Sequence, residues 1–512
     1  MIMRKVYRIL MSCGYTLIES GGVRSQNAGH SLFKTLLILI TTALAYWIFG
    51  YAFAFGQNAN VILGYQFWAS ERFGDRDLRP GVENYTNSNP VYNLNNQDPY
   101  IHYFYHYMLA FLVTNIAASA FAERCRVPVY VLFSFVMAGF VYPFLSHWMW
   151  GKYGWLGNTI GARDYGGSAI VFLTAGIAAL IGTAFLGPRF GRFEPRSLPL
   201  FGHSIPITSV GAILVAFGFF VLNSGADHRI TGNAFGDRVG HGLINTLLSG
   251  ATSGAVYYIL QRLIEKIRKP ARHLKRRVFL STVNSILAGM VAVAGGAVTY
   301  NPWSSVIIGL IAAFSFLIWS KLLTRLHIDD PVETAAVHIG GGLWGIFAVP
   351  IFRRSVEFLP DGSWRPSDGT TRFWSIIYNI TQGESWRGLL NALCTAAVVI
   401  AWVAIFIALL FLILKLINLL KVSREEELRG IDLFQHGEPA YALRIYCAAC
   451  GEQLQAKTIE TETGMGVAQR GNFPAIVTDA EGAIVPIEYF TDNRNGGGKP
   501  IKIGGINDEN RV

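Results

Sequence analysis

One ionisable side chain lies deep inside a long apolar stretch of the sequence, IDDPVETAAVHIGGGLWGIFAVP at Ile328–Pro350. After its charged start, this stretch is apolar apart from Thr334 and His338. A helical rise of ~1.5 Å per residue would put His338 ~12 Å beyond Asp330, near the middle of a ~30 Å hydrocarbon core. Ionisable groups inside membranes are costly and usually functional, and an imidazole can exchange a proton or accept a hydrogen bond. We therefore interpret His338 as a pathway residue, the alternative being a histidine satisfied by a neighbouring helix.

The start of this stretch has the residues expected at a helix N-terminus. Asp329 or Asp330 can accept hydrogen bonds from the amides of the first turn. Pro331 fits the first helical position, and Glu333 suits the positive end of the helix dipole. The sequence therefore predicts a membrane helix that begins near residue 331.

The composition predicts a polytopic membrane protein. Apolar residues make up 52% of the 512 residues and charged residues only 15%, which is unusual for a soluble globular chain. The net charge of +10 could indicate nucleic-acid binding. However, the basic residues cluster in short connections between apolar runs, as expected for the charge bias that orients membrane helices. We expect no nucleic-acid partner, and no cleavable signal is evident in Met1–Ser20.

Apolar windows of spanning length indicate an all-α architecture. Ten windows are clear, and a shorter one at residues 5–19 is a doubtful eleventh that could be a half-span or an incomplete first helix. The last window is too long for one straight crossing, so its helix is expected to continue beyond the membrane. The ten clear windows fall at 32–56, 100–122, 127–150, 165–187, 204–223, 239–261, 277–297, 303–323, 331–351 and 387–420.

The loops predict an orientation. Basic clusters at residues 189–196 and 262–277 fall on one side if the spans alternate, and the positive-inside rule makes that side cytoplasmic. Both sequons, at Asn84 and Asn379, then fall outside as glycosylation candidates. The polar segment 421–512 becomes a cytoplasmic tail. Its pair Cys447 and Cys450 lacks a second pair to complete a tetrahedral site, so we expect no metal and no cofactor.

A second stretch echoes the one around His338. Asp164 stands eight residues before Phe172, just as Asp330 stands eight residues before His338, and small residues follow both. Because the two helices would start from opposite faces, the echo indicates an inverted repeat whose centres meet near the midplane. The site would then contain one imidazole facing an aromatic ring, without a second imidazole to receive its proton.

Several blocks in order carry a family resemblance. They are TLIESGGVRSQN at 16–27, AERCR at 122–126, YPFLSHWMWG at 142–151, DYGGSAIV at 164–171, LNSGA at 222–226, DDPVETAAVH at 329–338 and GIDLFQHGEPAY at 430–441. Together they resemble the ammonium transporter/Rhesus family. The resemblance implies eleven helices with an outside N-terminus, a 5+5 inverted repeat, and a homotrimer in the plasma membrane with one pore per subunit. Residues 1–420 would form the transport domain, which conducts ammonium or ammonia and possibly methylammonium.

The resemblance also assigns roles to individual positions. His338 matches the second of two midplane histidines, and Phe172 stands where the first would be. Trp150 matches an aromatic residue of the outer vestibule, where a cation–π contact recruits the cation, and Asp164 matches a nearby helix cap. At other positions this chain departs from the family pattern: Ala226 stands at the vestibule serine, Leu109 and Leu222 at the two gate phenylalanines, and Phe219 at a vestibule aromatic. The tail residues Asp432 and Gly437 are expected to dock beneath the pore.

Two functions follow as hypotheses. The first is a transporter or channel for ammonium, based on the matched blocks, His338 and Trp150. The second is a non-transporting ammonium sensor or regulatory relative, based on Phe172, Ala226 and the unusual tail. An enzyme is not expected, because the sequence shows neither a nucleophile–base pair nor a metal cluster.

Overall fold

A computed structural model gives the fold. It describes residues 2–56, 60–71, 73, 99–194, 200–225, 235–268, 278–353, 384–438 and 440–441, together with short strands within 356–366 and 445–486. The chain divides into two compact units, Met1–Ala440 and Tyr441–Val512. The first unit is helical, and residues 421–440 belong to it.

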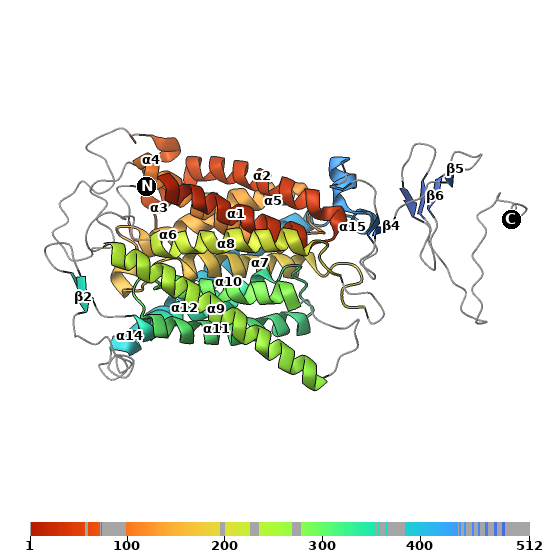
Figure 1. Cartoon of the computed structure of the whole chain (residues 1–512). Coiled ribbons are helices and arrows are strands. Elements are labelled where there is room, and N and C mark those ends of the chain that lie inside the picture. Colours follow the sequence, from red (N-terminus) through yellow and green to blue (C-terminus); the bar gives the residue numbers. More distant parts are fainter. Residues whose placement is uncertain are drawn as a thin grey trace, which may run out of the picture. The chain divides into compact units, whose positions relative to one another are not determined.

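The first unit is a bundle of long helices packed side by side (Figure 1). Within the described residues, eight helical segments are long and apolar enough to cross a membrane, and α1, α4 and the shorter α10 pack among them. The first helices are α1 (Ile2–Gly22), α2 (Ala28–Ala45), which runs through η2 (Tyr46–Gly50) into α3 (Tyr51–Phe55), and α4 (Pro99–Ser119). The others are α5 (Val127–Val136), η6 (Met137–Val141) and α6 (Tyr142–Trp150); η8 (Ser168–Leu173) and α7 (Thr174–Leu186); α8 (Ile205–Gly225); α9 (Phe235–Arg268); α10 (Val278–Ala294); α11 (Pro302–Arg325); α12 (Thr334–Phe352); and α14 (Glu384–Leu416).

Smaller elements close the two ends of the bundle. They are η1 (Ser25–Asn27), η3 (Trp68–Ser70), η7 (Trp155–Ile160), α15 (Arg424–Arg429), η10 (Asp432–His436), and the antiparallel strands β1 (Val356–Phe358) and β2 (Trp364–Pro366). One end of the bundle carries α15 and the segments 23–27, 120–126, 187–194 and 326–333. We call this end the tail face. The N-terminus lies at the opposite end (Figure 1).

The first helix is longer than the sequence predicted. Helix α1 has 21 residues and packs against α8, so it extends beyond the apolar window of residues 5–19 at both ends. The polar residues that ended the apolar window are inside the bundle. Glu19 forms a buried ion pair with Lys34 of α2, with 2.6 Å between Oε2 and Nζ. Because its charge is paired, Glu19 can lie inside the bundle without the cost of an isolated buried carboxylate.

The inverted repeat is visible in matched hydrogen bonds. A carboxylate oxygen of Asp164 accepts from the backbone N–H of Ala169 at 2.9 Å, and one of Asp330 accepts from that of Ala335 at 2.6 Å. Each aspartate therefore caps the backbone N–H group of the residue five positions later. Free amides at a helix N-terminus need such acceptors, so both repeats begin in the same way.

The two repeat helices also cross closely at matched glycines. A methyl group at Gly176 would lie 2.7 Å from the backbone nitrogen of Ile339, and one at Gly342 would lie 2.9 Å from that of Leu173. Gly176 and Gly342 each stand four residues after the central residue of their repeat. Small residues permit this approach in a membrane bundle, and the crossing brings residues 172 and 338 together.

The second unit contains short antiparallel strands. β3 (Ile445–Tyr446) pairs with β4 (Gln453–Leu454), while β5 (Ile459–Glu460), β6 (Gly466–Ala468), β7 (Ile476–Thr478) and β8 (Ile484–Pro486) form a four-stranded meander. The sequence did not predict these strands.

Candidate functional site: a midplane histidine and an anchored tail face

His338 is buried in α12, and both of its ring nitrogens have partners. Nδ1 lies 2.8 Å from the backbone oxygen of Thr334, so it carries the proton and donates to that carbonyl. Nε2 is then an acceptor, and the hydroxyl of Tyr15 on α1 donates to it at 3.0 Å. In the neutral imidazole, the single acceptor position is therefore occupied by a side chain.

Phe172 stacks directly on this imidazole. The two ring centroids are 5.8 Å apart with 26° between the ring planes. On its other side Phe172 stacks on Phe219 of α8, at 5.1 Å and 28°. All three side chains are buried, so they form a column of rings at the crossing of the repeats. The sequence placed Phe219 in the vestibule, whereas the structure places it against Phe172.

The two leucines at the predicted gate are also inside the bundle. Leu109 on α4 and Leu222 on α8 are 2% and 1% exposed. Leu222 lies one turn from Phe219 along α8, so the column of rings continues into an aliphatic region. Leucine keeps this region apolar but lacks the π face that would attract a cation.

Trp150 and Asp164 lie together at the end of the bundle opposite the tail face. The indole N–H of Trp150 donates to the backbone oxygen of Asp164 at 2.8 Å. Burial raises the pKa of the Asp164 carboxyl to about 6, although hydrogen bonds from the backbone N–H groups of residues 167–170 lower it. Asp164 thus caps η8 and holds Trp150 through its main chain.

The two aspartates before α12 have different roles. Asp330 caps the helix, whereas Asp329 accepts from Arg189 Nε at 2.7 Å and Arg192 Nε at 3.1 Å. The predicted capping role is therefore correct for Asp330 and wrong for Asp329, because the carboxylate of Asp329 forms ion pairs with guanidinium groups from another loop instead. The helix itself starts at Thr334, three residues later than predicted, since Glu333 adopts a left-handed backbone conformation with φ 59°.

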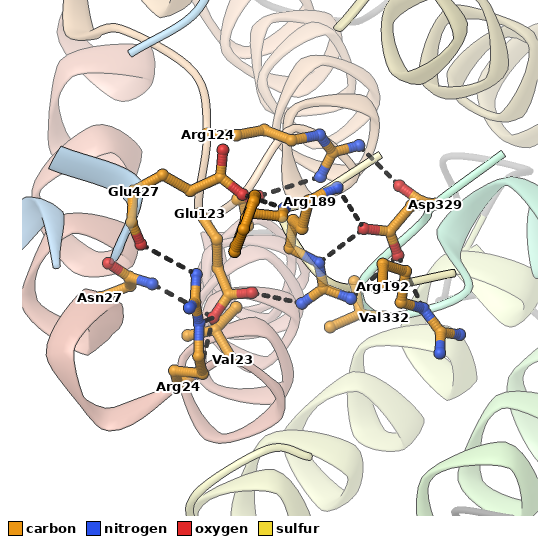
Figure 2. A network of polar contacts seen from close by, with 12 residues as sticks. Val23, Arg24, Asn27, Glu123, Arg124, Arg189, Arg192, Asp329, Val332 and Glu427 are labelled. Carbon is orange, nitrogen blue, oxygen red and sulfur yellow. Dashed lines mark hydrogen bonds and ion pairs between the residues drawn. The ribbon is translucent and has the colours of Figure 1, made fainter. Parts of the chain in front are cut away.

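Ion pairs connect the loops of the tail face (Figure 2). Glu123 pairs with Arg189 and, at 3.0 Å, with Arg24 Nε. Arg124 donates to the backbone oxygen of Asp329 at 2.6 Å. Burial alone would raise the pKa of Glu123, but the guanidinium groups of Arg189 and Arg24 hold it well below its usual range. Four loops from distant parts of the sequence are therefore fixed to one another.

The start of the tail joins the same network. A carboxylate oxygen of Glu427 on α15 accepts from the backbone N–H of Phe190 at 2.6 Å, and its backbone oxygen accepts from Arg24 at 3.2 Å. Asp432 then accepts from the backbone N–H groups of Gly29 at 2.9 Å and His30 at 2.6 Å. The tail therefore caps the N-terminus of α2 with a carboxylate.

The next residues complete this contact. His30 Nδ1 and His436 Nε2 are 3.0 Å apart, so one imidazole donates to the other. Gly437 follows in a left-handed conformation with φ 70°, which a residue with a side chain rarely adopts.

Comparison with known proteins gives the family. A sequence model of the Ammonium Transporter Family matches residues 1–441. The chain belongs to this family. A Caenorhabditis elegans protein named as an ammonium transporter is 32% identical over 450 residues, which cover 85% of this chain and 77% of that protein. Ammonium transporter 1 member 1 of Arabidopsis thaliana is 30% identical, with 83% and 81% of the two chains covered.

Solved structures of the ammonium transporter family share the fold. A protein titled Sensor Amt Protein matches with a TM-score of 0.69 at 26% identity, covering 85% of this chain and 96% of the other. Candida albicans Mep2 matches with a TM-score of 0.67 at 25% identity, covering 86% and 89%. The predicted family and membrane fold are confirmed. Relatives in this family are transporters or channels rather than enzymes, in agreement with the sequence.

Three predicted positions lie outside the described residues: Ala226 and the sequons at Asn84 and Asn379. Other residues of the site were not predicted. Tyr15 lay in the doubtful first helix, and no spacing pattern linked it to His338. Lys34 gave a signal that could have been used, because a lysine inside an apolar run requires a carboxylate partner.

Proposed function

We propose that this member of the ammonium transporter family conducts ammonium, as the cation or as ammonia, across a membrane. The path runs from Trp150 past Leu109 and Leu222 to the rings of Phe219 and Phe172, and then to His338. The observation that carries this proposal is a neutral imidazole buried where the two repeats cross. Ammonia and ammonium are small hydrogen-bond donors, and the imidazole Nε2 is an acceptor.

The arrangement supports transport of a small, largely desolvated solute. Trp150 is partly exposed and offers a π face to a cation arriving from water. Beyond it, the leucines and phenylalanines exclude larger polar solutes, because an unpaired polar group in such surroundings costs several kcal/mol, roughly 2–7. At His338 the solute would replace the Tyr15 hydroxyl on Nε2, so conduction requires Tyr15 to move.

Several finer features belong to the same proposal. We expect a homotrimer in the plasma membrane, with the N-terminus outside, the tail face in the cytoplasm, and glycans at Asn84 and Asn379. The positions of the basic loops support this orientation. We also expect the docked segment around Asp432 and Gly437 to couple the tail to the pore, since it contacts the start of α2.

A non-transporting ammonium sensor is the second candidate. It is supported by the engagement of both His338 nitrogens and by Phe172 in place of an imidazole. One structural relative is titled a sensor. In such a protein, ammonium would change the docking of segment 427–437 without any flux through the bundle.

Uptake of labelled methylammonium separates the two candidates. The full chain is expressed in cells that lack their own ammonium transporters, and its surface abundance is measured alongside uptake. Transport predicts saturable uptake that ammonium inhibits. Correctly folded protein at the cell surface without uptake would contradict transport. An ammonium-dependent change in proteolysis of the tail in that case would support the sensor.

A further inference from the structure

A cleft on the tail face takes no part in the proposed path. It lies between the loop after α7, residues 188–194, and residues 421–427, which follow α14 and run into α15, and its volume is about 600 Å³. The two walls are joined by the backbone N–H of Phe190, which donates to a carboxylate oxygen of Glu427 at 2.6 Å. Sites for small molecules have volumes of roughly 300–1,000 Å³. We call this preformed site the basic cleft.

The charges that line the basic cleft are mainly positive. Four cationic and two anionic side chains line it, which gives a net charge of +2: Arg189, Arg192, Lys421, Arg424, Glu194 and Glu427. Arg189 is buried, and its charge is paired within the network of Figure 2. The side chains of Arg192 and Lys421 are 35% and 38% exposed, and Arg424 is exposed as well. Three cations from the two walls are therefore accessible to a ligand.

Arg424 makes a ring contact but no ion pair within the described part of the chain. Its guanidinium carbon lies 4.2 Å from the centroid of the Phe190 ring, and no described carboxylate or carbonyl accepts from this guanidinium. Arg429 on the same helix differs, because Glu425 accepts from it at 2.9 Å. Stacking on an aromatic face holds the plane of a guanidinium but leaves the N–H groups at its edge unused. Arg424 is therefore a preorganised donor that lacks an acceptor.

The other two accessible cations use only part of their donors. Arg192 Nε donates to a carboxylate oxygen of Asp329 at 3.1 Å. Lys421 Nζ donates to the backbone oxygen of Pro188 at 3.3 Å and lies 3.4 Å from a carboxylate oxygen of Glu427. A guanidinium has five N–H donors and an ammonium group has three. Counting the described residues alone, each of these side chains therefore keeps at least one donor for a ligand.

A phosphate monoester matches the three cations better than a carboxylate does. It carries a charge of about −1.5 to −2 at pH 7 and has three strong acceptor oxygens, whereas a carboxylate has one charge and two oxygens. The fork of a guanidinium also fits two oxygens of a phosphate. A cationic ligand, in contrast, would be repelled by the net positive charge of the lining.

We propose that the basic cleft binds a phosphate monoester, whose oxygens accept from Arg424, Arg192 and Lys421. The ester is either a soluble molecule on the side of the tail face or the headgroup of phosphatidic acid at the membrane surface. Because Arg192 and Lys421 stand on opposite walls, the bound phosphate joins the start of the tail to the loop after α7. The site contains none of the residues of the proposed path, so it stands independently of transport.

A ligand that bridges the two walls should hold residues 421–427 in place. If the phosphate binds only while the walls are in contact, a ligand concentration of about 100 times Kd reduces the separated population about a hundredfold. Two backbone amides report this separation, because each donates across a contact that it breaks: Phe190 donates to Glu427, and Val422 donates to the backbone oxygen of Arg124 at 3.1 Å. Hydrogen exchange at both amides should therefore slow by up to about a hundredfold.

Hydrogen exchange of the full chain in phosphatidylcholine nanodiscs tests the proposal. Adenosine monophosphate is the soluble probe in one arm. In the other arm phosphatidic acid is added to the lipid, with the diester phosphatidylglycerol as its control. Protection of Phe190 and Val422 by adenosine monophosphate alone assigns a soluble ester, and protection by phosphatidic acid alone assigns the headgroup. Equal protection by phosphatidylglycerol, or no protection by either probe, would overturn the proposal.

Arg424→Gln is the deciding variant, and Arg429→Gln is its matched control on the same helix. In Arg424→Gln, the probe concentration for half-maximal protection should rise at least about tenfold, because hydrogen bonds between charged groups are lost. Arg429→Gln should respond as wild type does. Wild-type protection in Arg424→Gln would contradict the site. If that variant fails to fold, Arg424→Lys, which keeps the charge but loses the planar fork, replaces it and should also bind more weakly than wild type.

Discussion

The hydroxyl of Tyr15 donates a hydrogen bond of 3.0 Å to Nε2 of His338, and this bond joins α1 to α12 at the crossing of the inverted repeats. The same imidazole is oriented from the other side by the carbonyl of Thr334. In this arrangement a side chain occupies the acceptor position that the proposed function assigns to the transported molecule.

Replacing Tyr15 with phenylalanine should free this acceptor. The Tyr15→Phe variant keeps the ring and loses one hydrogen bond, which is worth about 1 kcal/mol. If displacement of the hydroxyl limits transport, methylammonium uptake should rise roughly fivefold, the factor that corresponds to this free energy. Tyr46→Phe is the matched control, because the buried Tyr46 hydroxyl has no hydrogen-bond partner among the described residues. Equal uptake in wild type and Tyr15→Phe would show that this bond does not limit flux.

Restoring an imidazole at position 172 should increase conduction. The ring of Phe172 is stacked between His338 and Phe219, so histidine in the Phe172→His variant would face His338 with a hydrogen-bonding nitrogen. We expect severalfold higher methylammonium uptake, together with a loss of about 1–3 kcal/mol in the free energy of unfolding, because a buried polar group replaces an apolar one. Phe172→Leu removes the ring without adding a nitrogen and should not increase uptake. A gain in both variants would point to space rather than to the imidazole.

The sequence predicted the features that depend on local pattern. Apolar windows gave the membrane helices, and the equal spacing of Asp164 to Phe172 and of Asp330 to His338 indicated the repeat that the matched caps and glycines show. Such features are readable because each depends on a few neighbouring residues. The fold class and family therefore followed from sequence.

Contacts between distant segments were not predictable in this way. Tyr15 and His338 are 323 residues apart, and no periodicity joins them. Asp329 looked like a helix cap because its partner Arg189 lies 140 residues earlier in the chain.

Removing Arg189 should strongly destabilise the tail face. Its side chain is 1% exposed and pairs with Glu123 and Asp329, both fully buried. Arg189→Met would leave two buried carboxylates without a main partner, which costs about 3–5 kcal/mol. Arg429→Met is the control, because Arg429 forms an exposed pair with Glu425 that is worth roughly 0–1 kcal/mol. Thermal unfolding in detergent measures both, and similar losses would show that the Arg189 network contributes little.

The stability of the tail face should also depend on pH in a defined direction. The folded-state pKa of Glu123 is depressed by Arg189 and Arg24, despite its burial. Its ionised form is therefore favoured by folding, so its contribution is fully present above the unfolded value of about 4 and is lost as the pH falls through the lower folded value. Wild type should be more stable than Glu123→Gln at pH 7, and this difference should shrink only below about pH 4. Unfolding midpoints from pH 3 to 7 test this, and a difference that disappears near pH 6 would contradict it.

Asp432 should control whether the tail stays docked. Its carboxylate caps α2 by accepting from Gly29 and His30, and loss of such a cap costs about 0.5–2 kcal/mol. In Asp432→Ala, hydrogen exchange at these two amides should accelerate by roughly 2–30-fold. Glu425→Ala, at an exposed position of α15, should leave both amides unchanged. If the docked tail is coupled to the pore, Asp432→Ala and deletion of residues 430–512 should change methylammonium uptake in the same direction. Faster exchange with unchanged uptake in both would show that the tail docks without regulating transport.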